Sequence, residues 1–151
     1  MPVLSFTRVT DVPTADAWAQ VHNQIIPNAP LTVDQVVDRS TAYILDLATL
    51  DRTVVGCSTV RPATVDEPVT VIARILPAFR RRGFGSALLA YALTHAQGLE
   101  AVAVQTIVLA SNPDGLEFAL RRGFVETDRY TLDGESVPYV HLEADLERLG
   151  T

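Results

Sequence analysis

The chain has 151 residues, of which 48% are hydrophobic, and a formal net charge of −6. This length and apolar content predict one compact domain over residues 1–151 with a full buried core. The acidic balance argues against a nucleic-acid-binding protein, since that function needs a cationic face to neutralise phosphates.

The first half of the chain predicts strands and short helices in alternation. We expect a strand at residues 3–7, a helix at 14–25, and strands at 42–48 and 53–60 joined by a tight turn around Asp51. Thr32 followed by Gln35 forms a capping box, which predicts a second short helix with Val33, Val36 and Val37 turned inward.

The second half continues the alternation. Residues 69–76 are almost all aliphatic, as expected of a central strand buried on both faces, and a helix at 83–97 follows, with Gly98 as its stop. We expect a strand at 102–109, a helix capped by Asn112 and ended by Gly123, and a closing hairpin of residues 124–130 and 137–143. Short connections and no linker indicate a single α/β domain.

The segment between the central strand and its helix predicts an anion site. Three arginines, Arg80 to Arg82, precede Gly83 and Gly85, and glycines allow backbone N–H groups of a helix N-terminus to approach a ligand. Arginine forks match phosphate oxygens. Two other phosphate-binding loops do not fit. A Walker loop requires Lys directly after its last glycine, but Ser86 follows Gly85. A dinucleotide-binding fingerprint requires a third glycine at the position of Leu88.

The run Pro77-Ala78-Phe79-Arg80-x-x-Gly83-x-Gly85-Ser86 resembles the acetyl-CoA pyrophosphate loop of the GNAT-type N-acetyltransferases. A second stretch, from Ile107 through Asn112 and Phe118 to Gly123-Phe124, is similar to the Asn-to-Gly-Phe segment of that family. The resemblance spans nearly the whole chain. It implies an α/β (α+β) GNAT fold, whose central mixed, largely antiparallel sheet splays between strands 4 and 5 and is flanked by helices.

The resemblance also implies a cofactor site for acetyl-CoA. Backbone groups of Ile75 and Leu76 would pair with the pantetheine arm, and the pyrophosphate would rest on the loop amides. Asn112 would cap its helix, contact the cofactor, or do both. The cofactor residues expected on this basis are Ile75, Leu76, Arg80, Arg81, Arg82, Gly83, Phe84, Gly85, Ser86, Asn112 and Phe118.

In such a site an amine attacks the thioester directly, so the single cysteine, Cys57, is not needed and is expected to be a small buried hydrophobe. Ala119 occupies the position where the resemblance would place the tyrosine that often protonates the leaving thiolate. Asp66 and Glu67, just before the central strand, are candidate bases or solvated loop residues. Candidates to replace the missing acid are Ser111, Tyr130, Tyr139 and Tyr43.

Arg74 and His22 are two further residues that could contribute to an acceptor site. Arg74 interrupts the apolar central strand and, if buried, needs a partner or an anionic ligand such as a substrate carboxylate. His22 lies near the expected acceptor entrance and is a weak catalytic candidate, while the three histidines show no metal-site spacing.

The function expected is acetyl or acyl transfer from acetyl-CoA to an amine of a small molecule, protein or peptide. The alternative, motivated by Ala119, is an acyl-CoA-binding domain that is weakly active or inactive. With one cysteine, no leader pattern and no apolar run near the ~18 residues of a membrane span, we expect a cytoplasmic protein without a membrane partner. Exposed strand edges make a homodimer plausible.

Overall fold

The computed structural model describes residues 3–149. The strands are β1 (Leu4–Arg8), β2 (Ile44–Leu50), β3 (Thr53–Arg61), β4 (Val69–Ile75), β5 (Ala103–Leu109), β6 (Val125–Tyr130) and β7 (Tyr139–Asp145). The helices are α1 (Val12–Ile25), α2 (Val33–Arg39), α3 (Phe84–Gly98), α4 (Pro113–Arg121) and the short α5 (Leu146–Leu149), with a 3₁₀ turn, η1 (Pro77–Phe79), before α3.

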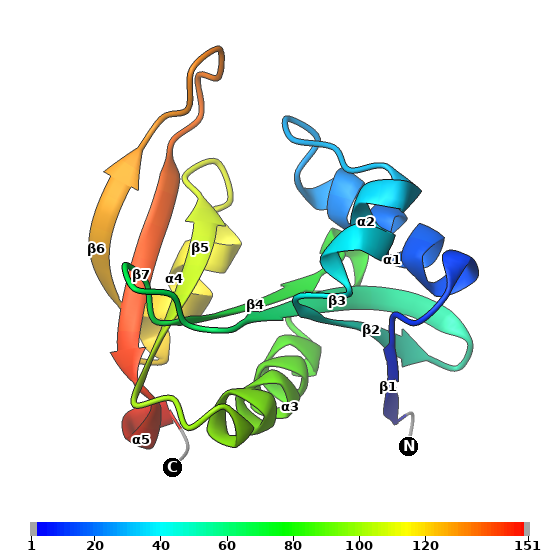
Figure 1. The fold of residues 1–151 in the computed structure, drawn as a ribbon, viewed down its shortest axis with the longest axis horizontal. Helices are drawn as coiled ribbons and strands as arrows, with labels where there is room; N and C mark the ends of the chain where they lie inside the picture. Colours follow the sequence, from blue (N-terminus) through cyan, green and yellow to red (C-terminus); the bar gives the residue numbers. More distant parts are fainter. Residues whose placement is uncertain (1–2, 150–151) are drawn as a thin grey trace.

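The seven strands form one sheet in the order β1-β2-β3-β4-β5-β7-β6 (Figure 1). Every neighbouring pair is antiparallel except β4 and β5, which run parallel. The expected mixed, largely antiparallel sheet is therefore confirmed, and β4 lies at its centre as its apolar sequence predicts.

Two helical layers cover the sheet. Trp18 of α1 and Val36 of α2 pack with Cys57 of β3 in one cluster, while Leu89 of α3 and Ala119 of α4 pack in another cluster that includes β4 and β5. In Figure 1, α1 and α2 accordingly lie on the opposite side of the central strands from α3. Together, these two clusters form most of the core on the two faces of the sheet.

The sheet opens between β4 and β5. Their pairing is limited to Val69 with Val104 and Thr70 with Gln105, whereas β4 stays paired with β3 to Ile75. Strand β5 remains paired with β7 along its whole length. Beyond Thr70 the two parallel strands diverge, which confirms the predicted splay.

Local signals account for most helix ends. The capping box of Thr32 and Gln35 is present, and Asn112 caps α4 with Pro113 at its first position. Helix α1 begins at Val12, two residues earlier than expected, because Asp11 and Thr14 form a further capping box. The turn at Asp51 and Arg52 is a two-residue hairpin in which both residues have positive φ, 48° and 70°.

Two expectations about helices need correction. Val37 is 37% exposed, since the short α2 buries only Val36 fully. Gly98 does not stop α3 but is its last residue, and the left-handed position falls on Glu100, with φ 60°. The short η1 and α5 were not predicted, as neither carries a periodic pattern long enough to identify.

Candidate functional site

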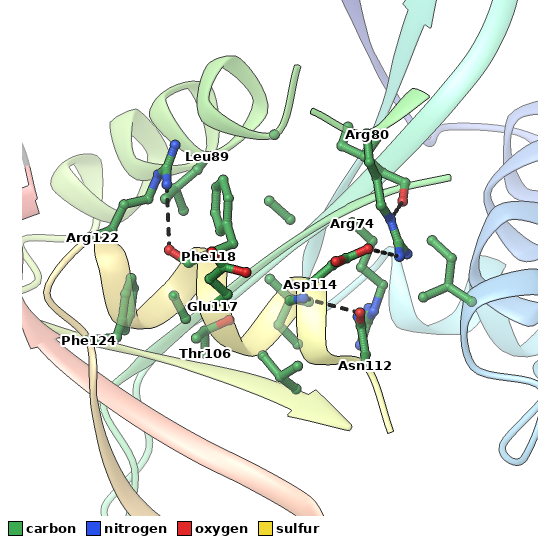
Figure 2. Close-up of a pocket in the computed structure, with 18 of the residues that line it drawn as sticks. Arg74, Arg80, Leu89, Thr106, Asn112, Asp114, Glu117, Phe118, Arg122 and Phe124 are labelled. Carbon is green, nitrogen blue, oxygen red and sulfur yellow. Dashed lines mark hydrogen bonds and ion pairs between the residues drawn. The ribbon is translucent and has the colours of Figure 1, made fainter. Parts of the chain in front are cut away.

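A cavity of about 280 Å³ lies where β4 and β5 separate (Figure 2). Its walls come from both strands, from the loop before α3, from α4 and from the end of α1. Ile72 and Ile75 supply apolar wall on β4, while Thr106 and Leu109 face it from β5. The divergence of two parallel strands thus creates space inside the sheet.

The loop before α3 presents backbone donors to this cavity. Gly83 is the N-cap residue of α3 with φ 82°, and no side chain caps the helix there. The next amide that is bonded within the helix is that of Ala87, which donates to the Gly83 carbonyl at 3.2 Å. The N–H groups of Phe84, Gly85 and Ser86 are therefore the free donors of a helix N-terminus, where the helix dipole also favours an anion.

Gly85 is required by close packing rather than by its dihedral angles. A Cβ atom at this position would lie 3.1 Å from Cε1 of Phe118, a ring that reaches across from α4. A larger side chain would push into the space between α3 and α4. Gly83 has no neighbour that a Cβ would meet, and its positive φ explains the choice of residue instead.

Two arginines of the loop are held at the cavity by α4. The Nη1 atom of Arg80 lies 3.4 Å from Asp114 (Figure 2), and Nη2 of Arg81 lies 3.2 Å from the same carboxylate. The Nε atom of Arg80 also donates to the Ile75 carbonyl at 2.8 Å. Arg82 instead places its guanidinium over the Phe84 ring, 5.0 Å from the centroid, outside the cavity.

Helix α4 forms the opposite wall. The Oδ1 atom of Asn112 accepts from the Gly115 amide at 3.1 Å, so this helix start is closed by its own cap. Phe118 projects into the cavity with the Arg122 guanidinium 3.7 Å from its ring centroid. Arg122 also donates to the Ser86 hydroxyl, and burial lowers the pKa of its guanidinium. These contacts join the start of α3 to the end of α4 across the cavity.

Most of the expected cofactor residues line this one cavity. They are Ile75, Arg80, Arg81, Gly83, Gly85, Ser86, Asn112 and Phe118. Leu76, Arg82 and Phe84 do not line it. The Leu76 amide donates to the Val55 carbonyl and its carbonyl accepts from the Phe79 amide, so both backbone groups are occupied within the protein.

The candidate acid and base residues lie elsewhere. Glu67, Ser111 and Tyr130 do not line the cavity, although Ala119 does and is 3% exposed. The position at which the sequence resemblance places a tyrosine therefore presents only a methyl group to the cavity wall. Ser111 is exposed next to the Asn112 cap.

Glu67 and Tyr130 are the two ends of a hydrogen-bond chain that runs across the sheet. The Tyr130 hydroxyl lies 2.8 Å from Nε2 of His141, and Nδ1 of His141 lies 3.3 Å from Oε1 of Gln105. The Gln105 amide nitrogen donates to Glu67 at 3.0 Å and to Thr70 at 2.9 Å. Gln105 was not predicted as a site residue, although a polar glutamine in an apolar strand is a visible signal, and the sequence gives His141 an ordinary setting on the last strand.

These contacts assign the protons along the chain. Since the Gln105 amide nitrogen donates to Glu67, its oxygen accepts from His141, which places the imidazole proton on Nδ1. The Nε2 atom then accepts from the Tyr130 hydroxyl. Burial, followed by the charges of Glu67 and Asp128, raises the pKa of Tyr130, which keeps this hydroxyl protonated at neutral pH.

Two loops meet near the β7 end of this region. The side-chain nitrogen of Asn28, between α1 and α2, donates to Glu135 at 2.5 Å and lies 3.3 Å from the Tyr139 hydroxyl. Tyr139 donates to the same Glu135 oxygen at 3.1 Å. Figure 1 shows the α1–α2 connection and the β6–β7 hairpin on the same side of the molecule. The three side chains therefore tie these loops together.

His22 is not placed for catalysis at the cavity. It is 7% exposed, stacks on Trp18 and does not line the cavity. Burial lowers the pKa of His22 to about 4, so it is neutral at physiological pH. Packing against Trp18, rather than catalysis, accounts for the histidine at this position.

Residues 3–149 carry neither a metal cluster nor a membrane-spanning helix. No group of three or more His, Cys, Asp or Glu side chains there could hold a metal ion. Among the helices of the same range, none is long and apolar enough to span a bilayer.

Comparisons with known proteins agree with this geometry. A family model described as the acetyltransferase (GNAT) family matches residues 12–124. A search of curated protein sequences gave no significant match.

Solved structures share the fold at low sequence identity. A protein from Acinetobacter baylyi ADP1 superposes with a TM-score of 0.78 at 13% identity, covering 97% of this chain and 95% of its own. The yncA protein of Salmonella typhimurium, solved with its cofactor acetyl-CoA, gives 0.76 at 14% identity, with 97% and 94% covered. Arabidopsis thaliana NAA60, in complex with a bisubstrate analogue, gives 0.75 at 16%, with 95% and 98% covered.

Proposed function

The chain belongs to the GNAT family of acetyltransferases, and on this basis we propose that it transfers an acetyl group from acetyl-CoA directly to a primary amine. The observation that carries the proposal is the uncapped start of α3 at Gly83, with Arg80 and Arg81 beside it at the opening between β4 and β5. A turn with a purely structural role would not need free amides and two arginines at a cavity.

The residues present fit the chemistry of acetyl-CoA. Free amides of Phe84, Gly85 and Ser86 suit a pyrophosphate, and arginine forks add charge-assisted donors. The unpaired edge of β4 beyond Thr70 leaves backbone groups for an amide-bearing chain, and Ile75 lies at the end of that edge. When bound, acetyl-CoA supplies an activated acetyl thioester.

Leu76 has no such role in the proposal, because its amide and carbonyl are already bonded to Val55 and Phe79. Arg82 and Phe84 side chains stack on each other outside the cavity, so only their backbone groups can take part. Asn112 supports the site by closing α4.

The attacking amine needs a proton acceptor, and we propose Tyr130 with His141 for this role, through a water molecule, because Tyr130 does not line the cavity. The Tyr130 hydroxyl donates to Nε2 of His141, so the Tyr130 oxygen can take a proton from that water while its own proton passes to the imidazole. Gln105 and Glu67 hold the imidazole in the tautomer that this transfer requires. Ser111 receives no role.

The leaving thiolate needs less assistance. A thiol has a pKa near ~8.5, so departure without a tyrosine at position 119 is a tolerable step for this reaction. A water molecule can supply the proton. Ala119 therefore does not exclude activity.

Acetyl transfer is tested by thiol release from acetyl-CoA with a panel of amines, together with calorimetry of CoA binding. We expect micromolar-range binding and thiol release with some amine. Tyr130→Phe should lower kcat about 100-fold or more and leave CoA affinity unchanged, since general acid–base catalysis typically contributes about 10²–10⁴-fold. Unchanged kcat in this variant would remove Tyr130 from the mechanism.

A non-catalytic acyl-CoA-binding domain is the second candidate, and the buried Ala119 at the family tyrosine position favours it. Tight CoA binding with no thiol release from any amine would establish this alternative.

We also propose that the chain forms a single domain and that it can form a homodimer. The continuous seven-stranded sheet supports one domain, and the edge strand β6, whose residues are all exposed, offers a surface for a second copy. Light scattering of the purified protein tests the homodimer. We also propose a cytoplasmic location.

A further inference from the structure

The one charged side chain of β4 has no hydrogen-bond or ion-pair partner among the described residues. Arg74 stands in the sequence Val-Thr-Val-Ile-Ala-Arg-Ile, and its side chain lines the cavity (Figure 2). Within residues 3–149, no hydrogen bond or ion pair involves Arg74. An arginine stays protonated even where it is partly buried, so its charge remains uncompensated.

Arg74 projects from the face of the sheet that carries α1 and α2. It pairs in register with Cys57 of β3, and directly opposed residues of antiparallel strands share a face. Cys57 packs against α1 and α2, whereas the adjacent Ile75 packs with Leu88 of α3. Arg74 therefore lies on the other side of β4 from the loop that suits a pyrophosphate.

The surroundings of Arg74 are positive rather than negative. Burial lowers the pKa of its guanidinium, and Arg61 and Arg39 lower it further, while the opposing influences come from Cys57 and Tyr139. Both of these are neutral groups at physiological pH, because their own pKa values are raised by burial. The Nε atom of Arg61 is itself buried without a hydrogen-bond partner.

A partly buried guanidinium without a counter-charge is costly to keep, since it loses hydration and gains nothing in return. An anionic ligand reverses this balance, and a planar carboxylate matches the guanidinium fork with two parallel hydrogen bonds. We propose that Arg74 binds a carboxylate of the acceptor, so that the acceptor is a small amine bearing a carboxylate, such as an amino acid. The identification of the ligand as the acceptor rests on the proposed acetyl transfer, whereas the anion site at Arg74 does not.

The loops near the site favour a small acceptor over a protein chain. Asn28, Glu135 and Tyr139 bridge the α1–α2 connection to the β6–β7 hairpin on the Arg74 side of the sheet. An extended peptide would have to break these contacts to pass between the loops. A small amino acid needs no such opening.

The anion site can be tested by binding, without turnover. The protein is saturated with CoA, and its thermal unfolding is followed with a panel of N-acetyl amino acids and with the matching N-acetyl amino acid amides. We expect at least one acid to raise the midpoint, and its amide to bind about 10- to 100-fold more weakly, the range of a charge-assisted hydrogen bond.

Variants assign the effect to Arg74. Arg74→Gln should remove the preference for the acid and keep the stabilisation by CoA, and Arg74→Lys should restore part of it through charge without the fork. Arg52→Gln, in the exposed turn between β2 and β3, removes the same charge elsewhere and should change neither.

The outcomes separate the two proposals. Equal binding of acids and amides, binding by no acid, or an acid preference that survives Arg74→Gln would overturn the carboxylate site. Thiol release with amines that lack a carboxylate, at the same kcat/KM as amino acids, would overturn it while leaving acetyl transfer intact. Acid binding through Arg74 with no thiol release would support the site and overturn acetyl transfer.

Discussion

The two helices that face the cavity begin in opposite ways. Helix α3 starts at Gly83 with no side-chain cap, so its first amides are open, whereas α4 starts at Asn112, whose side chain accepts from the Gly115 amide. The acidic residue in the first turn, Asp114, belongs to the capped helix and holds Arg80 and Arg81. One helix start is thus open to an anion, and the other organises the positive side chains around it.

This contrast assigns different expected roles to the two helix starts, anion binding to α3 and structural support to α4. A helix N-terminus attracts anions through its free N–H groups and its dipole, and an internal cap satisfies those groups in advance. Substitutions at the two helix starts should therefore affect different quantities. CoA affinity should follow α3, and folding stability should follow α4.

The largest effect is expected from filling the space at the start of α3. Gly85→Val places side-chain atoms against Phe118, where even a Cβ would lie at 3.1 Å, and should weaken CoA binding by at least about 100-fold. Isothermal calorimetry measures this loss. Gly98→Val, at the other end of the same helix where a Cβ meets nothing within 4 Å, is the matched control and should bind normally. Equal affinity in both variants would contradict the assignment of this helix start.

A smaller effect is expected from removing charge next to the open amides. Arg81→Gln should lower CoA affinity about five- to tenfold and flatten its dependence on salt, because an exposed charge-assisted contact is screened by ions. Calorimetry at two salt concentrations measures both changes. Arg52→Gln removes an exposed arginine of similar positive φ, 70° against 63°, and should leave affinity unchanged.

The carboxylate on α4 should act in the opposite direction. Asp114→Asn releases Arg80 and Arg81 from their ion pairs, so CoA binding should strengthen about two- to fivefold, within the range of exposed ion pairs. A loss of affinity would instead show that the carboxylate is needed to position the arginines. Glu117→Gln, which breaks the pair with Arg121 on the same helix, is the control.

The smallest change in CoA affinity is expected at the cap of α4. Asn112→Ala should lower the free energy of unfolding by about 1 kcal/mol and change CoA affinity by less than about twofold. Asn112→Asp keeps an oxygen acceptor and should recover most of the stability. Urea unfolding and calorimetry on the same samples measure the two quantities. A larger loss of affinity than of stability would show that Asn112 contacts the cofactor directly.

The sequence predicts the parts of the site that are contiguous in the chain. The loop from Arg80 to Ser86 and the cap at Asn112 are short local patterns, with dihedral and hydrogen-bonding demands that particular residue types meet. The central position of β4 follows from its aliphatic run, which only Thr70 and Arg74 interrupt. Local chemistry was enough for each of these features.

The sequence does not predict contacts that depend on strand register. Glu67 and Tyr130 were proposed separately, and only the pairing of β4, β5, β7 and β6 shows that Gln105 and His141 connect them. The link from Asp114 to both arginines spans the cavity and has no local pattern either. Arg74 falls between these two cases. The sequence shows a charged residue in an apolar strand, but only the structure shows that it has no hydrogen-bond or ion-pair partner among residues 3–149.

The environment of Cys57 has a practical consequence for every assay of this protein. Its side chain is fully buried, and burial raises the pKa of the thiol to about 12, so it presents no thiolate at neutral pH. Because Cys57 is the only cysteine in the chain, a thiol reagent added to the folded protein reports released CoA without a background from the protein. The same residue becomes reactive when β3 separates from its neighbours, so its labelling rate without substrate measures how often the sheet opens.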